Sequence, residues 1–178
     1  MAAPETLFYS THNTPIGTLL LVASGRALRA IRLLDTGADA YQQAAALYPH
    51  ASMTPLESYF TSLRPALDAY FRSEAPLTLP YELAGGTPLQ RMVWLALTKI
   101  PYGETISYSM LADRVGFPRA VRAVASACGA NPLPLVIPCH RVVAKDGTLG
   151  GFSLGGLAVK EQLLALEATA GAVQAQVA

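Results

Sequence analysis

The chain reads Leu-Val-Ile-Pro-Cys-His-Arg-Val-Val at residues 135–143, so that one cysteine lies between two apolar runs. Residues 135–137 and 142–144 have the aliphatic, β-branched composition of strands, and Lys-Asp-Gly at 145–147 is a turn signal. Pro138 has no N–H to donate within a sheet. The pattern predicts that Cys139 lies at a strand end or kink, where its side chain is both held and reachable.

Two neighbours of Cys139 favour ionisation of its thiol. An unperturbed cysteine has a pKa of about 8.5 and is mostly protonated at neutral pH, whereas the thiolate is the nucleophile. His140 can act as a base or ion-pair partner, and Arg141 adds positive potential. Composition equally permits an inert core cysteine, and adjacent strand residues point to opposite faces. The Cys-His pair alone therefore leaves both interpretations open.

A longer pattern resembles the O6-alkylguanine-DNA alkyltransferase family. It consists of Asn-Pro at 131–132, Pro-Cys-His-Arg-Val at 138–142, a glycine turn at 147, Gly-Gly-Leu-Ala-Val-Lys at 155–160, and Glu167. The resemblance is strong from about residue 87 to 167 and looser before that. It implies an α+β chain: a small N-terminal antiparallel sheet with helices, ribonuclease-H-like, followed by a mainly helical winged helix-turn-helix domain that carries the cysteine.

Composition and length limit the class of protein. A chain of 178 residues with 52% hydrophobic residues forms one ordinary domain or two small ones. No apolar run reaches the roughly 20 residues that span a bilayer, and the N-terminus lacks signal-peptide features. Two cysteines without an export signal indicate a reducing compartment, so we expect a cytoplasmic protein. The three histidines are scattered, which predicts no metal site.

Charge is unevenly distributed along the chain. The total is +1, but residues 1–86 carry −2 and residues 87–178 carry +3. A basic excess in the half that contains the cysteine suits a phosphate-binding surface. A chance fluctuation in surface charge explains the same numbers equally well.

The first half of the chain has the pattern of a scaffold. Strands are predicted at 6–11, 17–24 and 27–34 as an antiparallel meander, and helices at 38–48 and 56–72, the second kinked or split by Pro65. Gly-Gly at 85–86 is the best boundary. We therefore expect domains at 1–84 and 85–170, with a flexible tail at 171–178.

The second half predicts three helices before the cysteine. Thr87, Pro88 and Gln90 form a capping-box start for a helix that runs to about residue 99. Helices at 107–115 and 119–128, joined by Gly-Phe-Pro, have the form of a helix-turn-helix. A plain helical hairpin is the alternative. In the DNA-binding interpretation, the outward groups of the last helix are Arg119, Arg122 and Ser126.

The resemblance implies DNA repair by direct reversal of damage. Cys139 would take the alkyl group of O6-alkylguanine, and of O4-alkylthymine, from a nucleotide flipped out of double-stranded DNA. His140 would support the thiolate and connect through a water to Glu167, which follows the nucleophile, base and orienter logic of cysteine hydrolases. The thioether would be permanent, so each molecule would act once. We expect a monomer that needs no cofactor and contacts no membrane.

Further roles follow from the same resemblance. Tyr108 would pack against the 3′ phosphate and help to protonate the leaving guanine, Asn131 would hold the turn before Cys139, and Arg122 would fill the space of the flipped base. The residues implied for the substrate pocket are Val142, Phe152, Ser153 and Lys160, the last of which would tie down its loop. The loop at 152–156 is one residue longer than the family's common form, and Phe152 replaces a tyrosine, which leaves the alkyl-size preference open.

Other functions remain possible at this point. Glu167 and Lys160 share one helix face with residues 163 and 164, and charged groups on such a face are usually solvated. A non-catalytic binder of alkylated bases would lack Cys139. A winged-helix regulator would leave residues 138–141 without a purpose, and a cysteine hydrolase normally has its histidine far from its cysteine in sequence.

Overall fold

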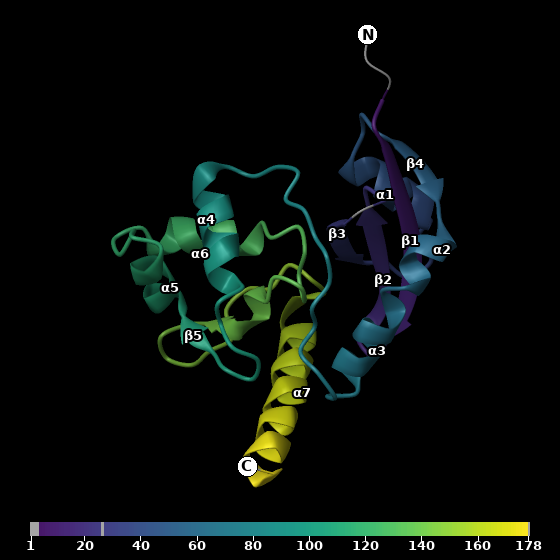
Figure 1. Cartoon of the computed structure of the whole chain (residues 1–178). Coiled ribbons are helices and arrows are strands. Elements are labelled where there is room, and N and C mark those ends of the chain that lie inside the picture. The colour runs from purple at the N-terminus through teal and green to yellow at the C-terminus, as the bar shows by residue number, and fades with distance from the viewer. Residues whose placement is uncertain (1–3, 26, 178) are drawn as a thin grey trace. The chain divides into compact units, whose positions relative to one another are not determined.

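The computed structural model describes residues 4–25 and 27–177, with side chains up to residue 169. The chain forms two compact units, one up to Glu82 and one from Leu83 onward (Figure 1). The sequence-based boundary lies two residues later, after residue 84. No helix in the described part of the chain is both long enough and apolar enough to cross a bilayer.

The first unit is built on a four-stranded sheet. Its strands are β1 (Thr6–Thr14), β2 (Gly17–Ala23), β3 (Leu28–Leu33) and β4 (Ser52–Pro55), in the order β3-β2-β1-β4. The first three pair as the predicted antiparallel meander, and β4 adds to β1 in parallel. The sequence did not predict β4, because this short edge strand is mostly exposed and has no apolar pattern.

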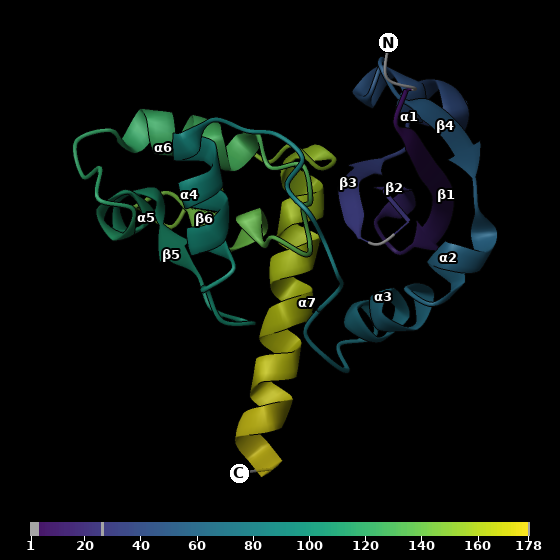
Figure 2. The same ribbon diagram turned by 45° about the horizontal axis from the view of Figure 1, so that its top comes forward.

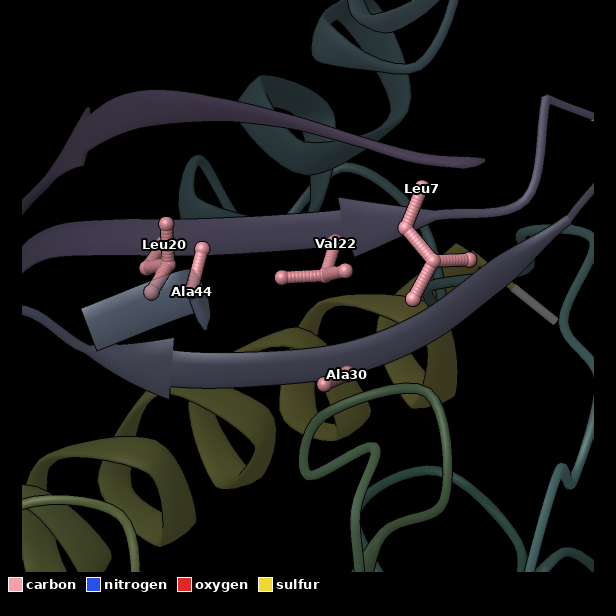
Figure 3. Close-up of a cluster of buried hydrophobic side chains, with 5 residues drawn as sticks. All are labelled: Leu7, Leu20, Val22, Ala30 and Ala44. Atoms are coloured by element: carbon pink, nitrogen blue, oxygen red, sulfur yellow. The ribbon is translucent and has the colours of Figure 1, made fainter. Parts of the chain in front are cut away.

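Three helices accompany this sheet: α1 (Ala40–Leu47), α2 (Glu57–Thr61) and α3 (Arg64–Phe71). The predicted helix at 56–72 is split, and Pro65 lies in the first turn of α3, where its missing N–H costs nothing. The core of the unit gathers side chains from the sheet and from α1, which Figure 3 shows together: Leu7, Leu20, Val22, Ala30 and Ala44.

The second unit begins with α4 (Pro88–Leu97), and its predicted capping box is present. Gln90 N donates to Thr87 Oγ1 at 3.2 Å, and Thr87 N donates to Gln90 Oε1 at 2.8 Å. The predicted helix-turn-helix is formed by α5 (Tyr108–Arg114) and α6 (Val121–Gly129). Trp94 of α4 donates from its indole nitrogen to the Ala127 carbonyl at 2.8 Å, which joins α4 to α6.

Short elements connect this helical group to the last helix. β5 (Ile106–Ser107) pairs in parallel with β6 (Val142–Val143), and η1, a single 3-10 turn, covers Cys139–Arg141. The long helix α7 (Gly156–Val177) packs against η1 (Figure 2). The backbone of α7 is assigned through Val177, so it enters the segment predicted as a tail, and flexibility of residues 171–178 stays a prediction.

The strand expected at residues 135–137 is absent, so of the predicted strand end or kink, the strand end is wrong and Cys139 lies in an irregular turn. These residues form turns, Leu135 has a φ of +76°, and Cys139 opens η1. Prolines at 132, 134 and 138 remove N–H donors that a strand would need. The apolar run reflects burial instead, since Leu133 and Ile137 are both fully inaccessible.

Candidate active site

The Cys139 thiol is held by the amide of Asn131. Asn131 Nδ2 lies 3.1 Å from Cys139 Sγ and donates to the Ile137 carbonyl at 2.7 Å, while Asn131 Oδ1 accepts from Leu133 N at 3.0 Å. One buried side chain therefore fixes both the irregular turn and the sulfur at its end. This placement agrees with the turn-holding role that the sequence predicts for Asn131, and its share in catalysis stays a proposal.

A cavity of about 300 Å³ opens onto this sulfur. Tyr108, Phe152 and Ser153, all predicted site residues, contribute to its wall. Val142 and Lys160 were predicted for the pocket, but both are fully buried and lie outside its lining. The remaining lining residues are Ala125, Cys128, Gly129, Cys139 and Gly151.

Sequence reasoning missed the contribution of α6 to this cavity. Ala125, Cys128 and Gly129 follow one another at the i, i+3, i+4 spacing of a single helix face. This stripe of small residues is the sequence signal that could have indicated a close approach of the helix to the cysteine. In the structure it forms one wall of the pocket beside Cys139.

One buried carboxylate collects donors from three residues in two segments, the turn η1 and the loop that contains Gly103. Glu167 on α7 accepts from Arg141 Nε at 2.7 Å, from Arg141 Nη2 at 2.9 Å and from the Gly103 backbone N at 3.1 Å. His140 Nε2 lies 2.7 Å from Glu167 Oε1, and since an ionised carboxylate only accepts, Nε2 carries the proton. The same tautomer leaves the lone pair on Nδ1, as a base requires.

Two expectations about Glu167 need correction. The contact with His140 is direct, because a separation of 2.7 Å leaves no room for the water implied by the resemblance. A solvated helix end is also excluded, since Glu167 is 1% exposed. The guanidinium of Arg141 offsets the cost of burying this charge, because it forms an ion pair with the Glu167 carboxylate. The guanidinium itself donates to the Ile100 carbonyl at 2.7 Å and lies over the Tyr102 ring.

The buried network fixes the charge states of its members. Burial by itself raises the pKa of Glu167, but hydrogen bonds from His140 and Arg141 outweigh it and lower that pKa to about 2. Burial lowers the pKa of His140, although the contact with Glu167 opposes this. At neutral pH the site therefore holds an anionic carboxylate and a neutral imidazole, which is the form that can accept a proton from a thiol.

We expect the second unit to lose stability in acid in two stages. The ordinary pKa is 6.5 for His140 and 4.5 for Glu167, and in the folded protein both pKa values are lower. Each group therefore makes its full contribution to the free energy of unfolding only when the pH is above its ordinary pKa. The free energy of unfolding begins to fall below pH 6.5, where the imidazole of His140 takes up a proton in the unfolded chain. It falls further from pH 4.5 towards about 2, where the carboxylate of Glu167 does the same. The carboxylate stage amounts to about 3 kcal/mol.

Urea unfolding at a series of pH values measures this loss. Trp94 is the chain's single tryptophan, is nearly buried and belongs to the second unit, so its fluorescence reports that unit alone. The variant Glu161→Gln serves as a control, because Glu161 is an exposed carboxylate on α7 outside the network. A free energy of unfolding that stays constant between pH 6.5 and 3 would contradict the assigned charge states.

Tyr108 and Lys160 lie beside the pocket and the network. Burial raises the pKa of Tyr108 to about 12, so its hydroxyl stays protonated at neutral pH. Lys160 Nζ donates to the Val142 carbonyl at 2.6 Å and to the Leu149 carbonyl. The same nitrogen lies 5.8 Å from the centre of the Tyr108 ring. The solvated alternative for Lys160 is excluded, since it is fully buried.

The predicted DNA-facing residues are exposed along α6. Arg122 and Ser126 lie on that helix, and Arg119 precedes it because α6 begins at Val121. Arg122 is three residues before Ala125, hence one turn away on the face that reaches the cavity. The helix therefore presents a cation next to the pocket mouth.

Comparison with known proteins gives two matches that together cover most of the chain. Residues 7–83 match the family model for the 6-O-methylguanine DNA methyltransferase ribonuclease-like domain, and residues 88–169 match the model for the DNA binding domain of the same name. The order of these two models agrees with the predicted ribonuclease-like and DNA-binding halves.

Curated relatives carry consistent names. The bifunctional transcriptional activator/DNA repair enzyme Ada of Escherichia coli is 43% identical over 161 residues, which are 90% of this chain but 45% of Ada. The chain thus spans just under half the length of that relative. A Mycobacterium tuberculosis methylated-DNA–protein-cysteine methyltransferase is 39% identical over 162 residues, covering 90% of this chain and 92% of its own.

Solved structures agree with the sequence relatives. Mycobacterium tuberculosis OGT in complex with DNA matches with a TM-score of 0.78 and 38% identity, covering 92% of this chain and 94% of that one. The O6-methylguanine-DNA methyltransferase of Pyrococcus kodakaraensis KOD1 gives a TM-score of 0.63 at 25% identity, covering 91% and 99%. The predicted α+β architecture is thereby confirmed.

Proposed function

Because the chain belongs to the 6-O-methylguanine DNA methyltransferase family, we propose that it repairs DNA by moving the alkyl group of O6-alkylguanine onto Cys139. The observation that carries the proposal is the position of the sulfur. Cys139 lines a cavity of about 300 Å³, its Sγ lies 3.1 Å from the Asn131 amide nitrogen, and the next residue in the chain is a neutral His140 that Glu167 orients. These are the parts of an activated thiol in a pocket large enough for a base.

The reaction we propose is a single in-line displacement. His140 takes the thiol proton, and the Cys139 thiolate attacks the alkyl carbon. A carbon–sulfur bond forms as the bond from carbon to guanine O6 breaks, and the electron pair leaves with the base. Tyr108, which stays protonated at neutral pH, supplies a proton to the guanine. The thioether is stable, so each molecule acts once and the protein is consumed as a stoichiometric reagent.

Duplex DNA is the proposed partner. The alkylated oxygen lies within the base stack, so the nucleotide must be extruded at a cost of a few kcal/mol. In the proposed complex Arg122 fills the vacated space, while Arg119 and Ser126 contact the DNA backbone; all three residues are exposed on α6 or just before it. The proposal extends to O4-alkylthymine, because thymine O4 and guanine O6 occupy the same edge of a base pair.

The cellular setting is proposed on the state of the thiols. Both cysteines are free, as is usual in a reducing compartment, and we place the protein in the cytoplasm. One chain supplies every residue of the described site, which fits action as a monomer.

Incubation with duplex DNA carrying one O6-methylguanine, followed by intact-mass measurement, tests the function. We expect a gain of one methyl group per chain, saturating there, and located at Cys139 by peptide mapping. Normal DNA binding without a mass gain would reject transfer and leave a protein that binds damage or regulates transcription.

Arg122→Ala should separate base flipping from chemistry. We expect transfer from duplex DNA to slow by about 10- to 100-fold, since the lost support for extrusion is worth a few kcal/mol. Transfer from free O6-methylguanosine should not change, because a nucleoside needs no extrusion. Arg114→Ala removes an equal charge from the exposed end of α5 and is the matched control. Equal slowing on both substrates would show that Arg122 acts in some other way.

A further inference from the structure

The two cysteines of the chain lie together in the active-site cavity. They are Cys128 in the last turn of α6 and Cys139 at the start of η1, and each is 3% exposed. Both line the same cavity, and Cys128 Sγ is 4.0 Å from the carbonyl oxygen of Cys139. The proposed transfer uses only one of these thiols, so the second has no part in the reaction described above.

Their arrangement suits a bond between the sulfurs. A disulfide needs Cα atoms about 4–7 Å apart, and a sulfur touching the main chain of the other cysteine brings the two residues near that range. The two residues are 11 apart in sequence and are joined by the turn that Asn131 holds. Both residues also line one cavity of about 300 Å³.

We propose that Cys128 is a resolving thiol, which captures oxidised Cys139 in an intramolecular disulfide that a dithiol can reverse. The oxidant is a hydroperoxide small enough to enter the cavity. The Cys139 thiolate attacks the terminal peroxide oxygen, the O–O bond breaks, a sulfenic acid forms, and the other oxygen leaves as an alkoxide, or as hydroxide when the oxidant is hydrogen peroxide. The Cys128 sulfur then attacks the sulfenic sulfur, the S–O bond breaks, and water leaves with the Cys128 proton.

The state of Cys128 changes during this sequence. Burial raises its pKa, and the negative charge of the Cys139 thiolate adds to the rise, so Cys128 rests as a thiol while Cys139 is reactive. A sulfenic acid is neutral, so that second contribution disappears once Cys139 is oxidised. Cys128 therefore becomes a better nucleophile at the stage when one is needed.

The consequence rests on the proposed function. An alkyl acceptor that works once has no means of replacing its sulfur, and oxidation beyond the sulfenic stage is irreversible for most proteins. When Cys128 captures the sulfenic acid of Cys139, oxidation stops at a disulfide, which a dithiol can reduce. While the disulfide persists, the Cys139 sulfur is blocked and alkyl transfer is switched off.

Peptide mapping tests the bond without any DNA. Wild-type protein is treated with hydrogen peroxide, labelled with N-ethylmaleimide under denaturing conditions and digested with trypsin. No lysine or arginine lies between Arg122 and Arg141, so both cysteines fall in the single peptide Ala123–Arg141. We expect this peptide to lose two hydrogens and to carry no maleimide. Dithiothreitol added before labelling should restore both labelling sites.

Variants of Cys128 supply the second arm. After the same oxidation, Cys128→Ala and Cys128→Ser should accumulate the sulfinic acid at Cys139. For each protein, the transfer capacity recovered with dithiothreitol is expressed as a fraction of the capacity before oxidation. This fraction should be severalfold smaller in each variant than in the wild type. The wild-type map remains decisive if a variant folds poorly.

Three results would overturn the inference: a wild-type peptide with both cysteines labelled, one with Cys128 labelled beside an oxidised Cys139, or a disulfide found only between two chains. The test is separate from that of the function. A disulfide in a protein that transfers no alkyl group rejects the repair function alone, and transfer without the disulfide rejects this inference alone.

Discussion

Cys139→Ala should abolish the methyl gain completely and leave binding to duplex DNA close to that of the wild type. The reason is chemical, because an alanine methyl group cannot form the carbon–sulfur bond, and no other nucleophile in the cavity takes over. Cys128, the second thiol, stays protonated in this variant, because burial is the larger cause of its raised pKa and remains when Cys139 is replaced. Intact-mass measurement with O6-methylguanine duplex, together with gel-shift titration, reports transfer and binding separately.

Cys128→Ala is the matched control for this experiment, since it also removes one thiol from the cavity wall. It should retain the methyl gain at Cys139. The mechanism would be wrong if Cys139→Ala still gained a methyl group, or if it lost DNA binding together with transfer while remaining folded by circular dichroism.

Glu167→Gln should reduce both stability and transfer. The substitution leaves the guanidinium of Arg141, which is 7% exposed, without its carboxylate, and removing one partner of a buried ion pair costs about 3–5 kcal/mol. It also deprives His140 of the charge that orients it, so transfer should slow by about 10²–10⁴-fold. Urea unfolding followed through Trp94, and the rate of methyl gain, measure the two effects.

The double variant Arg141→Met, Glu167→Gln separates these effects. If the stability loss comes from an unpaired buried charge, removing that charge should recover much of the free energy of unfolding. Transfer should stay slow, because His140 still lacks its partner. Full recovery of transfer in the double variant would mean that Glu167 acts only through the stability of the fold.

Local signals in the sequence predicted the parts of the fold that depend on local chemistry. Thr87 and Gln90 specify a capping box through hydrogen bonds within one turn, so the start of α4 was readable from four residues. The meander likewise follows from strand composition and intervening turns. The turn at Asn131 and the reactive Cys139 were recognised through a continuous motif rather than through distant contacts.

The sequence was misleading or silent where contacts between distant segments, rather than local propensity, determine the structure. Residues 135–137 are apolar because they fill the core, and three nearby prolines exclude the strand that their composition suggests. Cys128 was left without a role because only the approach of α6 to η1 shows that it shares a cavity with Cys139. For Glu167 the helix pattern alone also allowed a solvated position, and only the family resemblance indicated the active site, since its partners are 26, 27 and 64 positions away.

Those separations have a consequence for the order of events in folding. Each contact of Glu167 closes a long loop, so the chain loses conformational entropy before the contact can stabilise it. Docking of α7 is therefore a late step, after the local turns and helices of the second unit. A partly folded molecule has Cys139 in its motif but no oriented imidazole behind it. If Cys139 is the alkyl acceptor proposed above, we expect its nucleophilic reactivity to develop only with completed packing, so that the thiol does not react while the chain is still folding.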